Sequence, residues 1–248
     1  MYQKTVLPNG LQVLTAPMPQ VRSVAVSFYL GAGSRYEQET EAGLSHFVEH
    51  LCFKGTVRRP TPKEIAESID RVGGILNAAT DREYTVYYAK VAQGHFDLAL
   101  DLLADLIRNP VFEPGEMEKE RKVILEELAA VEDSPAQVAD LLLDGLIWPH
   151  QPLGWDVGGT PETVSAITRP LALDYTHRQY VPNNAVLSVA GAVEHERVLE
   201  QVQRTLGDWS KGRPSPWFAA QNGQRQHLGV RYKSTEQAHV VLAVPGLP

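Results

Sequence analysis

Several short stretches of the chain alternate apolar and polar residues, a pattern typical of strands with one buried face. Residues 4–15 alternate on both sides of Pro8-Asn9-Gly10, which predicts a hairpin whose turn lies at these three residues. Residues 22–31 are rich in β-branched and aromatic side chains and predict another strand. Three further predicted strands cover residues 75–80, 84–91 and 185–191.

Apolar residues at helical spacing predict helices between these strands. Thr61 is a typical helix cap and Pro62 a typical first residue, and Gly73-Gly74 would end that helix. The predicted helices cover roughly residues 41–53, 62–72, 95–109, 114–132, 135–147, 170–180 and 194–206. Because strands and helices alternate without a βαβ rhythm, we predict an α+β fold with a mainly antiparallel sheet flanked by helices.

A change in composition near residue 212 predicts a domain boundary. Residues 210–223 are rich in Pro, Gly and Ser and are typical of a linker. Two strand-like runs follow, at 228–233 and 238–244. We therefore predict one domain at 1–212, with 213–248 forming a linker and the first strands of an incomplete second domain.

The composition is that of a soluble globular protein, with 43% hydrophobic and 21% charged residues in a chain of 248. No apolar run reaches the roughly 18 residues of a membrane span, and the N-terminus lacks a secretory signal, so we predict a cytoplasmic protein. The single cysteine excludes an internal disulfide framework. A net charge of −7 argues against nucleic acid as the main partner and leaves basic peptides as plausible ligands.

The most informative motif is H-x-x-E-H at His46, Glu49 and His50, within the first of the predicted helices. Residues four apart share a helix face, so both imidazoles could bind one ion, and Glu49 would flank them at about 60°. Two imidazoles, a carboxylate and an open position are typical of catalytic zinc, and H-x-x-E-H is the inverzincin motif of metallopeptidases. A pair of hydrogen-bonded core histidines is the alternative interpretation. Cys52 falls on the apolar back of the helix and is interpreted as a core residue.

The predicted helix at 114–132 offers a third ligand. Glu120 and Glu127 fall on the margin of its apolar stripe, whereas Glu126 falls on the opposite side. A carboxylate at such a margin needs a partner, and a metal ion or a metal-bound histidine would supply one. Alternatively, both side chains extend outward to neighbouring lysine or arginine residues.

Taken together, these motifs resemble the pitrilysin family of zinc peptidases, in the bacterial branch close to the mitochondrial processing peptidase. The matching segments are residues 31–37, 43–50, 53–56, 73–80, 84–88, 120–127 and 180–184. The resemblance implies one zinc per chain held by His46, His50 and Glu127, with 76 residues between the last two. It also implies that Glu49 activates the attacking water and that Glu120 supports the site. Asn77, Ala78 and Ala79 match the edge strand on which the family docks a peptide substrate.

The chain departs from the family in length. Family members have two similar halves that close around the substrate, and the resemblance implies that this chain enters the second half only briefly. We therefore expect a fragment, or a homo- or heterodimeric partner or C-terminal half that completes the chamber. The predicted function is that of a zinc endopeptidase acting on short or unfolded peptides. A non-catalytic core subunit and the zinc-bearing chain of a two-chain peptidase are the alternatives.

Overall fold

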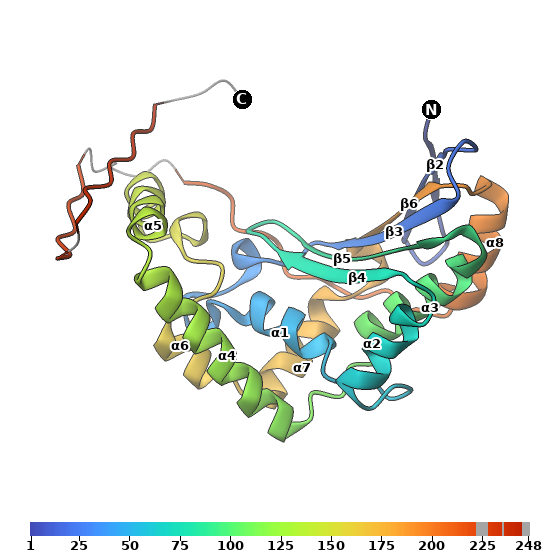
Figure 1. Cartoon of the computed structure of the whole chain (residues 1–248), viewed down its shortest axis with the longest axis horizontal. Coiled ribbons are helices and arrows are strands. Elements are labelled where there is room, and N and C mark those ends of the chain that lie inside the picture. Colours follow the sequence, from blue (N-terminus) through green and yellow to red (C-terminus); the bar gives the residue numbers. More distant parts are fainter. Residues whose placement is uncertain (222–227, 235, 245–248) are drawn as a thin grey trace.

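The computed structural model of the protein describes residues 1–221, 228–234 and 236–244. One sheet of six strands lies above a layer of helices (Figure 1). The strands follow the order β1-β2-β6-β3-β5-β4 across the sheet. They are β1 (Gln3–Val6), β2 (Gln12–Pro17), β3 (Ser23–Leu30), β4 (Ile75–Thr80), β5 (Thr85–Ala92) and β6 (Ala185–Gly191). The predicted α+β class with helices flanking a sheet is confirmed.

Four of the five strand pairings are antiparallel, including the predicted hairpin of β1 and β2. The exception is the parallel pair of β2 and β6, in which Gln12 lies opposite Val186. The alternation of residues along each strand gave no indication of this pairing, because it joins segments that lie far apart in the sequence. Strand β4 pairs only with β5, so it forms one edge of the sheet over the described part of the chain.

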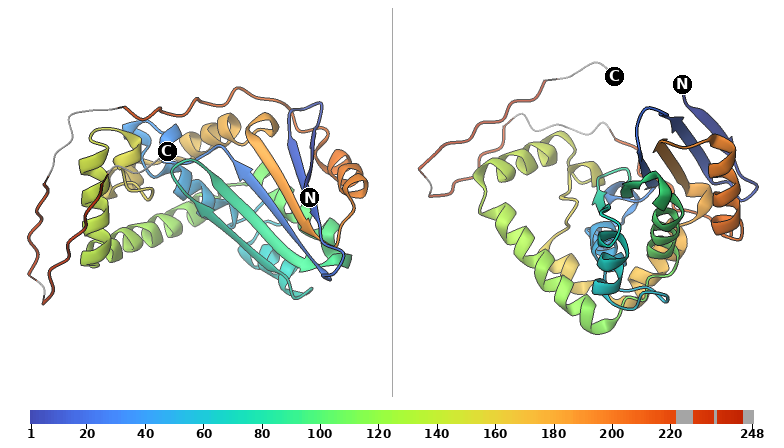
Figure 2. Two further views of the ribbon diagram at one scale, coloured as in Figure 1. Left: turned by 90° about the horizontal axis from the view of Figure 1, so that it is seen from above. Right: turned by 45° about the vertical axis from the view of Figure 1, so that its right-hand side comes forward.

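The alternation along β3 shows how the sheet divides the molecule. Val24, Val26 and Phe28 are fully buried against the helices. Tyr29 points to the other side and is 41% exposed. Seen from above, the strands lie in front of the helices α2 and α3 (Figure 2). The hydrophobic core therefore lies between one face of the sheet and the helical layer.

The helices of the structure agree closely with the predicted ones. They are α1 (Leu44–Cys52), α2 (Pro62–Asp70), α3 (Phe96–Arg108), α4 (Pro114–Glu132), α5 (Pro135–Ile147), α6 (Pro161–Ala166), α7 (Arg169–Gln179) and α8 (His195–Leu206). Thr61 caps α2 and Pro62 is its first residue, as predicted. Helix α6 was not predicted, because six residues are too few to show a helical period. Among the described residues, no helix has the length and apolar character needed to cross a membrane.

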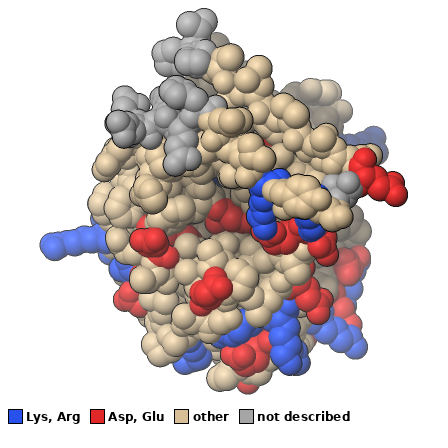
Figure 3. Space-filling view, turned by 90° about the vertical axis from the view of Figure 1, so that its left-hand side faces the viewer, with Lys and Arg blue, Asp and Glu red and all other residues tan. Residues whose placement is uncertain are grey.

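The predicted strands at 228–233 and 238–244 are wrong for this structure, which has no strand in either range. A strand forms only where its backbone groups pair with those of a neighbouring strand. In residues 228–233 the contacts with the rest of the protein are made by side chains instead. Arg231 binds Glu132 at the end of α4, and Lys233 lies 3.2 Å from Asp133. Figure 3 shows this side of the molecule, where acidic and basic side chains lie next to one another. The predicted domain boundary at residue 212 stays a prediction.

The predicted linker follows the surface of the core up to residue 221. Arg35, which is almost fully buried, donates from Nε and Nη2 to the carbonyl oxygen of Phe218, at 3.0 and 2.8 Å. Its guanidinium lies 3.8 Å from the centre of the Trp217 ring and pairs with Glu83. Gln179 also accepts a hydrogen bond from the backbone of Ser215. Arg35 thus joins the linker to the turn between β4 and β5.

Candidate metal centre

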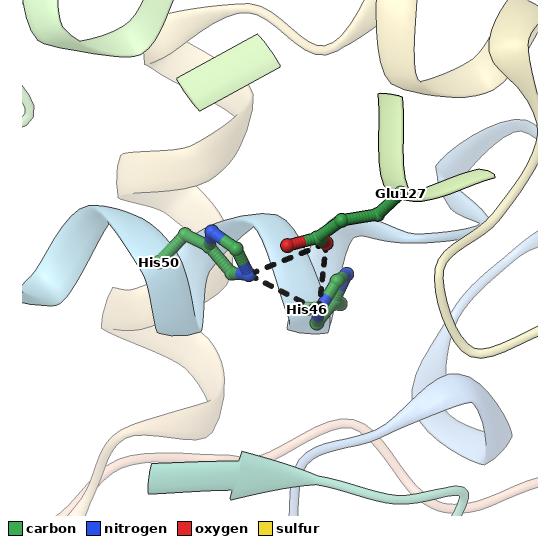
Figure 4. Close-up of side chains that lie close together, drawn as sticks. All are labelled: His46, His50 and Glu127. Atoms are coloured by element: carbon green, nitrogen blue, oxygen red, sulfur yellow. Dashed lines mark hydrogen bonds and ion pairs between the residues drawn. The ribbon is translucent and has the colours of Figure 1, made fainter. Parts of the chain in front are cut away.

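Three candidate ligand atoms from two helices converge beneath the sheet (Figure 4). His46 and His50 lie on one face of α1, with their Nε2 atoms 3.2 Å apart. Glu127 comes from α4, and its Oε2 lies 3.9 Å from Nε2 of His46 and 3.8 Å from Nε2 of His50. The structure therefore brings together the three residues that the sequence predicted as metal ligands.

The spacing of these atoms fits a single tetrahedral ion. Zinc bonds of about 2.0–2.1 Å place neighbouring ligand atoms roughly 3.3 Å apart at a tetrahedral centre. The two nitrogens already lie at this separation, and the carboxylate oxygen lies about half an ångström farther out. Because the Glu127 side chain is 48% exposed, it has room to move this small distance.

A buried carboxylate fixes the orientation of His50. Oε2 of Glu120 lies 3.1 Å from Nδ1 of His50, and its other oxygen lies 2.7 Å from Nζ of Lys54. If Nδ1 carries the ring proton and donates it to Glu120, Nε2 presents a lone pair to His46 and Glu127. The alternative in which Glu120 extends outward to a neighbouring cation of its own helix is therefore wrong. Sequence reasoning did not single out Lys54, although it lies one turn beyond His50.

His46 is held as a neutral ring. Burial, reinforced by the nearby His50, lowers its pKa to about 4. Its Nδ1 is buried and has no hydrogen-bond partner among the described residues. A neutral imidazole is the form that binds metal ions. Two imidazoles and a carboxylate that face one another form an electron-rich set that suits a divalent cation, so the residues present fit zinc.

Glu49 lies on the same helix as His46 and His50 and contacts the end of strand β4. Its carboxylate accepts a hydrogen bond from Oγ1 of Thr80, the last residue of β4. Burial raises the pKa of Glu49, and the nearby Glu127 adds to this, while the Thr80 hydrogen bond and His50 oppose it. A carboxylate with a raised pKa is suited to accept a proton near neutral pH. Sequence reasoning missed Thr80 as the partner of Glu49.

Helix α4 presents its acidic residues as helix geometry predicted. Met117, Ile124 and Leu128 are buried, which turns this side of α4 toward α1. Glu120 is buried beside His50, and Glu126 is exposed on the opposite side. The predicted burial of Cys52 in the core is also confirmed.

The three residues predicted to bind substrate lie on the edge strand β4. Asn77 and Ala79 are exposed, and Ala78 faces the interior. Strand β4 pairs with β5 on one side only, over the residues that the structure describes. An unpaired strand edge can add an extended peptide through main-chain hydrogen bonds. Thr80 connects this strand to Glu49, so the edge lies next to the cluster of His46, Glu49 and His50.

Comparison with known proteins now decides the family. The sequence profile described as insulinase, peptidase family M16, matches residues 12–160, which is more than half of the chain. The chain belongs to peptidase family M16. This is the pitrilysin family to which the motifs showed a resemblance. A second profile of the same family, described as the M16 inactive domain, matches residues 166–248.

Relatives of this M16 chain carry the names of zinc proteases. An uncharacterized zinc protease of Rickettsia felis is 39% identical over 243 residues, which is 98% of this chain and 58% of the relative. The probable beta subunit of the mitochondrial-processing peptidase of Arabidopsis thaliana is 41% identical over 200 residues, covering 81% of this chain and 38% of the relative.

Solved structures agree with this assignment. A protease from Helicobacter pylori superposes with a TM-score of 0.84 at 25% identity, covering 89% of this chain and 54% of that chain. The chain spans 58% of the Rickettsia felis relative and 60% of an uncharacterized zinc protease of Bacillus subtilis. It is thus an M16 zinc-protease-like chain that corresponds to part of its relatives' length.

Proposed function

We propose that this chain carries the zinc site and the general base of an endopeptidase that hydrolyses short or unfolded peptides. The observation that supports this most strongly is the convergence of His46, His50 and Glu127 from two separate helices. The names of the relatives support zinc as the metal. A bound zinc would lower the pKa of a coordinated water to about 7 and polarise the substrate carbonyl.

In this proposal the residues of the chain bind the peptide and move one proton. The edge of β4 at Asn77, Ala78 and Ala79 binds the substrate backbone as an added strand, which requires little of the peptide's sequence. Glu49 accepts a proton from the attacking water and can pass it to the leaving amine. Glu120 acts through His50, whose orientation it fixes, and so is a positioning residue rather than a catalytic one.

The chain corresponds to only part of the length of its M16 relatives. It spans 58% of the Rickettsia felis relative, so we propose that a second half or a dimeric partner closes over the exposed edge of β4. The partner would exclude water and contribute further groups to the reaction. The two-chain peptidase remains the alternative form of this proposal, and it uses the same residues of this chain.

The test is peptide cleavage by this chain together with the second half or partner that completes the chamber, with Glu49 replaced by glutamine. We expect Glu49→Gln to lower kcat by at least about 100-fold, the order of a general base's contribution, while zinc stays bound. The matched control is Glu126→Gln, which changes the same functional group on the solvent side of α4. Cleavage that survives Glu49→Gln would contradict the role of Glu49. A preparation that binds no zinc would favour the non-catalytic subunit instead.

A further inference from the structure

Helix α1, which carries His46, Glu49 and His50, begins at a residue that has no side chain to cap it. Gly43 precedes the helix in a left-handed conformation with φ of 91°. A Cβ atom at this position would lie 2.5 Å from the carbonyl oxygen of Gly158, so the close approach of that loop excludes a side chain. The first N–H groups of a helix have no partner within the helix, and here the usual capping residue is absent.

A glutamate outside the helix supplies the missing acceptor. The carboxylate of Glu37 accepts hydrogen bonds from the N–H groups of Gly43, at 3.0 Å, and Ser45, at 2.6 Å. It also accepts the hydroxyl proton of Ser45, whose oxygen lies 2.6 Å from the hydroxyl of Tyr175 on α7. Glu37 and Ser45 are both completely buried. The carboxylate lies at the positive end of the helix dipole, which favours its charged form and partly offsets the cost of burying that charge.

This contact lies directly next to the metal site along the chain. Ser45 is followed by His46, in the first turn of α1, whereas His50 lies in the last turn and is oriented by Glu120. The Nδ1 atom of His46 has no partner of its own among the described residues, so no side chain orients this ring as Glu120 orients His50. The position of His46 therefore depends on how firmly the first turn of α1 is held.

We propose that Glu37 is the positioning residue for His46: by fixing the first turn of α1 it places the His46 ring to bind the metal. This inference rests on the proposed function and adds a residue to it. Glutamine at position 37 would retain one acceptor oxygen but would direct an NH₂ group toward groups that already donate. The first turn would then lose at least one of its hydrogen bonds, and His46 would be free to move.

The experiment measures metal binding and the spectrum of bound Co²⁺ in the chain and its Glu37→Gln variant. We expect the variant to bind zinc about 10-fold more weakly. Loss of a residue that orients a metal ligand usually weakens metal binding by about 10- to 100-fold. We also expect weaker visible absorption by bound Co²⁺, because tetrahedral Co²⁺ absorbs more strongly than Co²⁺ with added water ligands. The matched control is Glu39→Gln, which changes an exposed glutamate two residues away and should alter neither quantity.

If Glu37 contributed only to the stability of the fold, the metal site of the folded variant would be unchanged. Zinc affinity and a Co²⁺ spectrum equal to those of the unmodified chain would therefore overturn the proposal. Ser45→Ala removes only the hydroxyl donor and provides a milder variant should Glu37→Gln not fold, with about 3-fold weaker binding expected. Unchanged binding in Ser45→Ala would then count against the proposal. Failure of the unmodified chain to bind zinc would instead contradict the proposed function, and this inference with it.

Discussion

Thr80 at the end of β4 donates a hydrogen bond to Glu49 on helix α1. This contact joins the edge strand, where we propose that substrate binds, to the proposed general base. The donated hydrogen bond stabilises the ionised form of Glu49, whereas burial opposes it. The geometry of β4 and the proton affinity of Glu49 are therefore coupled through one side chain.

Replacing Thr80 with valine keeps the shape of the side chain and removes the donor. Because the hydrogen bond lowers the pKa of Glu49, its loss should raise that pKa further and move the acid limb of kcat/KM to higher pH. We expect kcat/KM near neutral pH to fall by about 10- to 100-fold, because one hydrogen bond to a charged group contributes about 1.5–3 kcal/mol. A pH profile of peptide cleavage measures this. Thr80→Ser keeps the hydroxyl and should keep the profile, and an unmoved limb in Thr80→Val would count against the coupling.

Replacing Glu120 tests how His50 is oriented. Glu120→Gln retains the size of the side chain but weakens its contacts with His50 and Lys54. We expect zinc affinity to fall by about 10- to 100-fold, as is usual when the outer partner of a metal-binding histidine is lost. Calorimetric titration with zinc measures the change. Glu126→Gln on the solvent side of the same helix is the control, and equal affinities in the two variants would refute the assignment.

The buried Glu37 should make stability depend on pH near neutrality. Burial outweighs its hydrogen bonds and raises its pKa from an ordinary 4.5 to about 7. A carboxyl group whose pKa is raised on folding contributes stability that is complete below about 4.5 and lost as pH rises through about 7. The full contribution is about 3 kcal/mol.

Chemical denaturation of the chain and of Glu37→Gln, at matched pH values, isolates this contribution. Glutamine does not titrate, so the difference in unfolding free energy between the two proteins should change steadily between about pH 4.5 and pH 7. The unmodified chain should lose stability relative to the variant as pH rises. A difference that is constant over this range would show that Glu37 does not titrate there.

The linker segment should depend on Arg35 for its position. Arg35→Ala removes the donors to the Phe218 carbonyl and the cation that lies against the Trp217 ring. We expect a loss of about 2 kcal/mol in unfolding free energy and faster proteolytic cleavage between residues 212 and 221. Limited proteolysis followed by mass spectrometry measures the cleavage. Arg213→Ala, in the same segment, serves as the control, and unchanged cleavage in Arg35→Ala would contradict the assignment.

The histidine pair of the metal cluster was predictable because its geometry is local, and the resemblance to the family then selected Glu127 as the third ligand. The helical period places His46 and His50 on one face, and the same period puts Glu127, but not Glu126, at the margin of the buried stripe of α4. The hairpin of β1 and β2 was predictable for a similar reason, since the turn residues lie between its strands. The chemical roles of His46, His50 and Glu127 remain predictions.

What the sequence did not predict depends on contacts between distant segments. The pairing of β2 with β6 and the contact between Thr80 and Glu49 both require the folded sheet. The cap that Glu37 provides is unrecognisable by any local rule, because the usual capping position holds Gly43. The prediction of a strand at 228–233 is wrong for the converse reason. Its alternating pattern is local, but a strand also requires a neighbouring strand to pair with.

The central claim is that His46, His50 and Glu127 share one zinc ion. The most direct measurement is anomalous diffraction at the zinc absorption edge, from crystals of the chain grown with zinc. We expect a single strong peak between the Nε2 atoms of the two histidines and the carboxylate of Glu127. A zinc-containing crystal with no peak at that position, or with its peak held by other residues, would contradict the claim.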